Sequence, residues 1–292
     1  MYSKIVNPYN LKKINIKSIL GRKILQNYLL KTKIGGNGDT NRKKVAIHTV
    51  FIVRENILFL EEWLMYHCSI GFDTFYLYDN SKVEINLNPW DLRFSPKYIA
   101  QKTNKYGINY SDIVNLTDEE VYKRLTEIIN RIQTKVPNVD IKLIEWSPID
   151  PKTQKIEYKQ TEAHNECLKK LKQDKIDWCA SIDIDEFIKI RDFDNIKDYI
   201  NSLDKNIACC QLGMIQFENR WFNLDKKVLD ITNKPKKTIS RNTGNKNIFR
   251  VNDTRKLTVH KWLGNNRNVI KITPPIEEIC FYHYNSKTKC RA

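Results

Sequence analysis

Long apolar runs are absent from this chain of 292 residues. No stretch approaches the roughly 18–20 apolar residues that cross a bilayer, and the N-terminus lacks the short apolar core and cleavage site of a signal peptide. We therefore expect a soluble or peripheral protein, with the cytoplasm favoured. Residues 11–33 mix Lys and Arg with Ile and Leu at helical spacing. This pattern fits either a helix lying on an anionic membrane surface or a helix packed on its own domain.

Cysteine-based metal and redox signatures are also missing. The seven cysteines form no CxxC pair, and most of them lie inside apolar runs. This arrangement argues against a zinc ribbon or a thioredoxin-type site and favours buried, reduced thiols. The sequence leaves open whether one disulfide bond forms.

Acidic residues are the minority charge. The chain has 34 Asp and Glu against 50 Lys and Arg, a formal net charge of +16. Such a field attracts nucleotide phosphates, anionic membranes or nucleic acid, and it equally fits a need for solubility alone. No recognisable nucleic-acid reading motif is present, so we expect no nucleic-acid partner.

What the sequence does contain is a regular alternation of strands and helices. Residues 35–44 indicate a linker, so we expect a basic extension over 1–44 and a folded domain over 45–292. Apolar runs predict strands at 45–53, 73–79, 140–147 and 178–185, and helical spacing predicts helices at 57–71, 117–135, 154–173 and 193–203. Further strands are expected at 207–217, 256–262 and 278–284. The predicted fold class is α/β, with a mostly parallel, Rossmann-like sheet flanked by helices and a strand- and loop-rich C-terminal part.

Polar residues follow the predicted strands. In an open parallel sheet, ligands bind beyond the carboxyl ends of the strands, so the loops after Val53, Asp79, Trp146 and Ile182 should share one crevice. Three of these loops open with charged or amide side chains. They are Arg54-Glu55-Asn56, Asp79-Asn80-Ser81 and Asp183-Ile184-Asp185-Glu186.

The third of these loops carries the clearest chemical signal. Asp183, Asp185 and Glu186 place three carboxylates within four residues, and these repel one another in a crevice of low dielectric unless a cation lies among them. Mg²⁺ or Mn²⁺ prefers such oxygen ligands and also bridges to phosphate oxygens. The alternative is a solvated turn with helix-capping acids.

Several motifs, in their order and spacing, resemble glycosyltransferase family 92 and related GT-A enzymes of the family 2 type. The opening set comprises Val53-Arg54-Glu55-Asn56, Glu62-Trp63, Tyr66-His67, Gly71-Phe72-Asp73 and the run from Phe75 to Ser81. The later set comprises Gln160, Asn165, Cys167, Trp178, the run from Ile182 to Phe187, Lys236-Lys237, the run from Val259 to Trp262, and His283-Tyr284. Two positions depart from the family pattern: Glu55-Asn56 stands where the family has Asn-Glu, and Phe217-Glu218 where it has Phe-Gly.

The resemblance implies a metal-dependent hexosyltransferase of the GT-A type. A UDP-sugar would be the donor, with galactose favoured, and a glycan or glycoprotein the acceptor. The half over 45–190 would bind the nucleotide sugar, and 191–292 would form the acceptor and closing half. The implied metal ligands are Asp183, Asp185 and His283, with His260 as the second choice of histidine.

The expected donor contacts and catalytic groups extend over both halves. The residues expected at the nucleotide sugar are Arg54, Glu55, Asn56, Asp79, Asn80, Asn165, Asp183, Lys237 and Lys261. The resemblance implies that Asp185 would act in catalysis through the cation, and Glu218, just beyond the strand at 207–217, is the candidate base for an inverting mechanism. A retaining mechanism would not need that base.

Two other classes of function remain as alternatives. A sugar nucleotidyltransferase favours a glycine-rich phosphate loop near the first strand, and Arg54-Glu55-Asn56-Ile57 contains no glycine. A basic nucleic-acid-binding protein would use the positive charge directly.

Overall fold

The structure is a computed structural model that describes residues 4–6, 13–15, 43–57, 59–83, 116–217, 235–240 and 246–284. The chain divides into two compact units, residues 1–42 and 43–292. The described part of the first unit is an antiparallel pair of short strands, β1 (Lys4–Val6) and β2 (Lys13–Asn15). Of the predicted helix at 11–33 the structure describes only residues 13–15, and these form β2 instead of helix.

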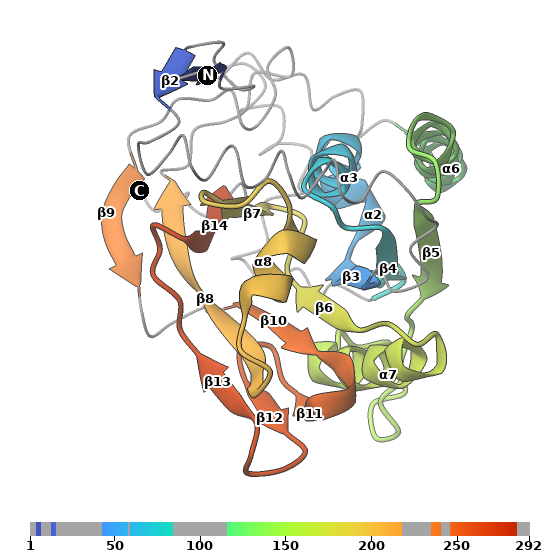
Figure 1. The fold of residues 1–292 in the computed structure, drawn as a ribbon. Coiled ribbons are helices and arrows are strands. Elements are labelled where there is room, and N and C mark those ends of the chain that lie inside the picture. The colour runs from blue at the N-terminus through green and yellow to red at the C-terminus, as the bar shows by residue number, and fades with distance from the viewer. Residues whose placement is uncertain are drawn as a thin grey trace. The chain divides into compact units, whose positions relative to one another are not determined.

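The second unit is built on one ten-stranded sheet flanked by helices (Figure 1). In chain order the helices are α2 (Val53–Asn56), α3 (Leu60–Ser69), α6 (Asp118–Lys135), α7 (Gln160–Gln173) and α8 (Ile196–Ser202). The first strands are β3 (Val45–Phe51), β4 (Thr74–Asp79), β5 (Asp140–Glu145), β6 (Trp178–Ser181) and β7 (Glu186–Ile190). The later sheet strands are β8 (Ile207–Phe217), β9 (Pro235–Ser240), β10 (Lys246–Arg250), β13 (Ile270–Ile272) and β14 (Ile279–Tyr284). A separate small pair joins β11 (Thr254–Leu257) to β12 (Trp262–Gly264).

The sheet is mixed, and the prediction of a mostly parallel sheet is correct only for its first part. Strands follow the order β5-β4-β3-β6-β10-β8-β14-β7, with β9 and β13 also pairing with β8. The pairs from β5 to β6 are parallel because helical crossovers connect these strands. From β6 onward β10 pairs antiparallel on both sides, and β14 is antiparallel to β7. The two predicted halves of the domain therefore share one sheet, and the division at residue 190 stays a prediction.

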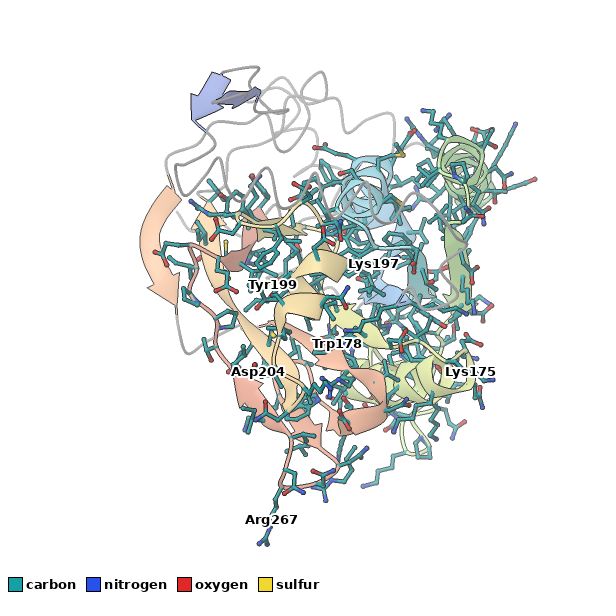
Figure 2. The ribbon with its side chains drawn as sticks, in the orientation of Figure 1. Lys175, Trp178, Lys197, Tyr199, Asp204 and Arg267 are labelled. Carbon is teal, nitrogen blue, oxygen red and sulfur yellow. The ribbon has the colours of Figure 1, made fainter. Side chains whose placement is uncertain are left out.

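Helices cover both faces of the parallel part. Side chains of β3 alternate between two buried clusters, so Ile47 packs with residues of α3 and α6 while Val50 packs with residues of α7. Figure 1 shows α3 and α6 on one side of these strands and α7 on the other. Figure 2 places Trp178 and Tyr199 among the packed layers, whereas Arg267 projects outward from its loop. The observed architecture is thus a mixed α/β fold with a large sheet.

Local signals explain the start of α6 and the end of α3. The predicted capping box at Thr117 is confirmed, since its hydroxyl accepts from the Glu120 N–H and the Glu120 carboxylate accepts from the Thr117 N–H. Gly71 has a φ of 99° just after α3, a conformation that only glycine adopts without strain. The predicted helix at 57–71 begins at Leu60 instead, and α7 begins at Gln160 rather than at residue 154.

Two expectations about the whole chain can be compared with the described residues. No helix among them is long and apolar enough to cross a membrane. All six described cysteines are free, and five of these six are buried, as the sequence predicts.

His67 of α3 forms the centre of an aromatic cluster in the core. Its Nδ1–H donates to the Trp63 carbonyl at 2.8 Å, and its Nε2 accepts from the Ile188 N–H at 3.3 Å. The ring stacks on Phe187. Because both nitrogens are used in the neutral form, and because burial opposes the charged form, the pKa of His67 is lowered to about 3.

We predict that acidification destabilises this fold through His67. The unfolded chain takes up a proton near pH 6.5 and the folded chain only near 3, so the free energy of unfolding falls as the pH falls through that window. The expected slope is about 1.4 kcal/mol per pH unit for this histidine. Burial also lowers the pKa of His48 and His164, which adds to the slope in the same sense. Urea unfolding at about pH 4.5, 5.5 and 7 measures the slope. His67→Asn should remove the contribution of this histidine and so lower the slope by about 1.4 kcal/mol per pH unit. An unchanged slope would contradict the prediction.

Candidate active site

The acidic residues form a tight turn between two strands. β6 ends at Ser181, earlier than the predicted strand at 178–185, and β7 begins at Glu186. The Asp183 N–H donates to the Glu186 carboxylate at 2.9 Å, and the Glu186 N–H donates to the Asp183 carbonyl at 3.1 Å. These two bonds close the turn, so the three carboxylates are held at the carboxyl end of the parallel strands.

Packing from the core fixes the orientation of this turn. The Ile182 N–H donates to the His48 carbonyl at 3.2 Å, which continues the pairing of β6 with β3. The indole Nε1–H of Trp63, a wholly buried residue of α3, donates to the Glu186 carbonyl at 2.8 Å. The turn is therefore tied to both β3 and α3.

A lysine from the far part of the sequence neutralises part of the acidic turn. The Lys246 ammonium lies 2.8 Å from the Asp183 carboxylate and 3.3 Å from the Glu186 carboxylate. Only 5% of the Lys246 side chain and 3% of the Glu186 side chain is exposed, against 37% for Asp183. A buried ammonium with two carboxylate partners stabilises charges that burial alone would penalise.

His283 approaches the remaining carboxylate. Its Nε2 lies 3.5 Å from an Asp185 carboxylate oxygen, and the Tyr284 N–H donates to the Asp185 carbonyl at 2.9 Å. The pairing of β14 with β7 sets His283 opposite Glu186. The structure thus brings to one corner Asp183, Asp185 and His283, the three metal ligands that the family resemblance implies, and their role stays a prediction.

The titrating groups of this corner influence one another. Burial raises the pKa of Glu186 to about 7, although the Lys246 charge opposes that rise. Burial acts to lower the pKa of Lys246, but Asp183 and Glu186 outweigh it and the pKa is raised. For His283 burial is again outweighed, here by the Asp185 carboxylate, and its pKa is raised.

Asp185 and His283 have the chemistry to hold a divalent cation. The described residues contain no group of three His, Cys, Asp or Glu side chains arranged around a common metal position. Mg²⁺ and similar ions are nevertheless commonly bound through one or two carboxylates together with substrate phosphates. An imidazole is also a suitable ligand for Mn²⁺. His283 Nδ1 is buried without a hydrogen-bond partner. Asp185 and His283 therefore fit a cation that is bound jointly by these two side chains and by the phosphate oxygens of a diphosphate.

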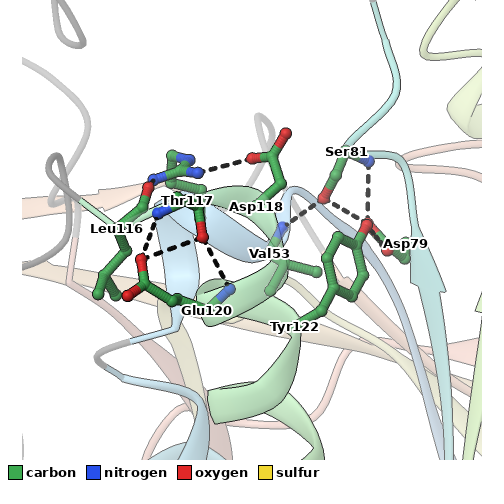
Figure 3. Close-up of polar contacts among 9 residues, drawn as sticks. Val53, Asp79, Ser81, Leu116, Thr117, Asp118, Glu120 and Tyr122 are labelled. Atoms are coloured by element: carbon green, nitrogen blue, oxygen red, sulfur yellow. Dashed lines mark hydrogen bonds and ion pairs between the residues drawn. The ribbon is translucent and has the colours of Figure 1, made fainter.

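The predicted residues after β4 are engaged within the protein (Figure 3). Both carboxylate oxygens of Asp79 accept hydrogen bonds, one from the backbone and hydroxyl of Ser81 and the other from the hydroxyl of Tyr122. Asn80 donates to the Trp146 carbonyl at 2.6 Å, and its Oδ1 is buried without a partner. These contacts fix the loops after β4 and β5 to each other.

The predicted residues after β3 lie in a short helix rather than a loop. The Arg54 guanidinium donates to the Leu116 carbonyl at 2.7 Å and pairs with Asp118 at 2.6 Å. Asn56 is buried and donates to the Ile52 carbonyl at 2.8 Å. The side chain of Glu55 lies outside the described part of the chain.

The other predicted donor residues lie on α7 and on later parts of the chain. Asn165 donates to the Thr161 and Leu257 carbonyls and accepts from the Leu257 N–H, so it fixes β11 to α7. Lys261 is exposed, and its N–H donates to the Thr258 hydroxyl. Lys237 lies on β9 but its side chain is outside the described residues, as is the whole of Glu218.

Sequence reasoning missed two groups near the acidic turn. Lys246 is a single lysine at the start of a strand, and only the pairing of β10 with β6 brings it to Asp183. The second group is a buried pair in which His48 Nε2 lies 2.9 Å from His164 Nδ1, with the Ser181 hydroxyl 3.3 Å from the same nitrogen. Burial lowers the pKa of His164 to about 4, with a further contribution from Lys246. The helical spacing of His164 offered no signal beyond core packing.

Comparison with known proteins gives one family match. The family model described as glycosyltransferase family 92 matches residues 114–290. No curated protein matches the chain. Among solved structures it is similar to the bifunctional glycosyltransferase WbbM in its apo form, with 13% sequence identity and a TM-score of 0.30. That alignment covers 71% of this chain and 33% of the WbbM chain, so this chain spans about a third of that protein's length.

Proposed function

The chain belongs to glycosyltransferase family 92 and is therefore a transferase, and we propose that it transfers a hexose from a UDP-sugar to a glycan or glycoprotein acceptor. Galactose is the favoured hexose, and inversion the favoured stereochemistry. We further propose that the mixed sheet is a GT-A type scaffold. Its parallel strands β3, β4, β5 and β6 would carry the donor at their carboxyl ends.

The observation that supports this proposal best is the group formed by Asp183, Asp185, Glu186 and His283, which we call the acidic corner. Asp185 and His283 lie 3.5 Å apart beside Asp183, at the end of a buried strand in the part of the chain that the family match covers. A divalent cation, Mn²⁺ or Mg²⁺, would supply charge for binding and releasing a diphosphate. Asp185 and His283 would hold it, with Asp183 next to them.

Residues outside this corner take distinct parts in the proposal. Lys237 and Lys261 would contact the departing diphosphate through charge-assisted hydrogen bonds. Arg54, Glu55, Asn56, Asp79, Asn80 and Asn165 would shape the donor site, and the internal contacts of all of them except Glu55, whose side chain is not described, support a positioning role. Glu218 remains the candidate base, and the basic residues 11–33 remain a candidate for peripheral membrane contact.

A donor screen tests the proposed function. Purified protein would be incubated with Mn²⁺ and UDP-, GDP- or CMP-sugars, and released nucleotide would be measured with and without candidate acceptors. We expect release from UDP-sugars above all, with UDP-galactose the fastest and release stopped by EDTA. Equal release from all three nucleotide classes, or release that EDTA does not affect, would count against the proposal. Formation of a nucleotide sugar from a sugar phosphate would instead indicate a nucleotidyltransferase.

A further inference from the structure

We infer that Lys246 is a built-in cation of the acidic corner, a positioning residue that engages Asp183 and Glu186 and leaves Asp185 and His283 to bind a single divalent ion. This inference rests on the proposed function. It goes beyond it because it assigns a role to Lys246, which the proposed function does not use, and because it explains through Lys246 why Asp183 would not hold the ion.

The placement of Lys246 is determined by the sheet. β10 lies between β6 and β8, with Asn247 opposite Ser181 at the end of β6. Lys246, one residue earlier, therefore stands beside the turn that follows Ser181. Its backbone position is fixed because Lys246 itself lies opposite Leu212 of β8 and the next residue, Asn247, pairs on both sides. The ammonium group is thus delivered by a central strand and not by a flexible surface loop.

The contacts of Lys246 divide the acidic corner in two. Its ammonium lies within 3.3 Å of Asp183 and Glu186, and Glu186 in turn accepts the Asp183 N–H. Asp185 instead faces His283. A metal ion bound to the Asp183 carboxylate would have to share it with an ammonium 2.8 Å away, which like-charge repulsion opposes. The Asp185–His283 pair carries no such competitor among the contacts that the structure describes.

The charges of the corner agree with this division. Asp183, Asp185 and Glu186 are three acids gathered around one ammonium and one imidazole. The three carboxylates exceed the one ammonium by two negative charges, and one divalent ion on Asp185 and His283 offsets that excess. A second divalent ion would have to displace a buried ammonium, which is costly because that ammonium would lose both partners.

The first test measures stability without metal or donor. Lys246→Met removes the charge and leaves two carboxylates without their partner, so we expect the melting temperature to fall by roughly 10 °C. Lys246→Arg should restore most of that loss. Adding Asp183→Asn and Glu186→Gln to Lys246→Met should also recover most of it, because the carboxylates are then neutral. Lys197→Met is a matched control, since Lys197 is a mostly buried lysine that pairs with Asp73 elsewhere in the fold (Figure 2). Its loss should not be recovered by the same two changes.

The second test measures binding of Mn²⁺ alone by calorimetry. The wild type should bind one ion, Asp185→Asn should weaken binding at least about tenfold, and Asp183→Asn should change it less than about threefold. Lys246→Met should bind Mn²⁺ at least about tenfold more tightly or take up a second ion, and Lys197→Met should match the wild type. Equal losses for Asp183→Asn and Asp185→Asn would overturn the inference. So would unchanged Mn²⁺ binding in Lys246→Met, or no binding by any of these proteins.

Failure of the proposed function would look different from failure of this inference. If UDP-sugars are not hydrolysed but the Mn²⁺ and stability results follow the pattern above, the arrangement of the corner stands and the choice of donor is wrong. If UDP-sugars are hydrolysed with Mn²⁺ while Asp183→Asn loses metal as fully as Asp185→Asn, the enzyme assignment stands and the role given to Lys246 is wrong.

Discussion

Replacing Asp185 with asparagine should lower Mn²⁺-dependent transfer by about 100- to 1000-fold while the protein stays folded. Asparagine keeps the size of the side chain but removes the negative charge that would hold the cation, and loss of one such charge in a shielded site costs several kcal/mol at the transition state. The backbone contact of residue 185 with Tyr284 does not depend on its side chain, so the turn itself should persist.

The control for this experiment is an acid far from the corner. Asp204 is exposed in the loop that leads into β8, where its carbonyl accepts the Ile207 N–H (Figure 2). Asp204→Asn should transfer at the wild-type rate. Both variants should melt within a few degrees of the wild type. Full activity in Asp185→Asn would remove this residue from the catalytic assignment.

Truncation of Trp63 to alanine should destabilise the protein by about 3–5 kcal/mol. The indole is fully buried, packs against His67 and Phe75, and donates to the Glu186 carbonyl. Alanine leaves a cavity and also leaves that carbonyl without its donor. Because Glu186 begins the strand that follows the acidic turn, the loss should reach the candidate site as well as the core.

Trp63→Phe separates packing from hydrogen bonding. Phenylalanine keeps one aromatic ring in the core and loses the indole N–H with only part of the buried volume, so we expect a smaller cost of about 1–2 kcal/mol. Urea unfolding measured for both variants under the same conditions gives the two values. A cost below about 1 kcal/mol for Trp63→Ala would show that the site tolerates collapse, and that α3 does not support the turn as we describe.

Much of the parallel part of the fold was predictable from local patterns. Continuous apolar runs located β3, β4 and β6, and the spacing of Thr117 and Glu120 located the start of α6. The strand predicted at 207–217 coincides with β8. These predictions succeed because periodicity and capping depend on neighbours in the sequence.

The mixed part of the sheet was not predictable in the same way. The short β9 and β10 have few apolar residues, and nothing in their sequences specifies that β10 pairs between β6 and β8. The partner of a strand is set by tertiary packing, and so is the direction in which it runs. The contact between Lys246 and Asp183 depends wholly on that pairing, so it too was hidden.

The candidate site shows the same limit. The acidic turn was predictable because its three carboxylates follow a buried strand, and His283 was named through a family resemblance. The bonds of Asp79 with Tyr122 and of Asn80 with Trp146 were not, since each joins residues more than 40 positions apart. Sequence reasoning therefore found the charged groups but could not tell which of them already have partners in the folded chain.

The most direct test of the account is calorimetric titration of the purified chain with UDP, first in Mn²⁺ and then in EDTA. We predict binding in Mn²⁺ that weakens at least about tenfold when the metal is removed, because in our proposal the cation would link Asp185 and His283 to the diphosphate. UDP binding of equal strength in both solutions would contradict the account, since the acidic corner would then have no part in holding the donor.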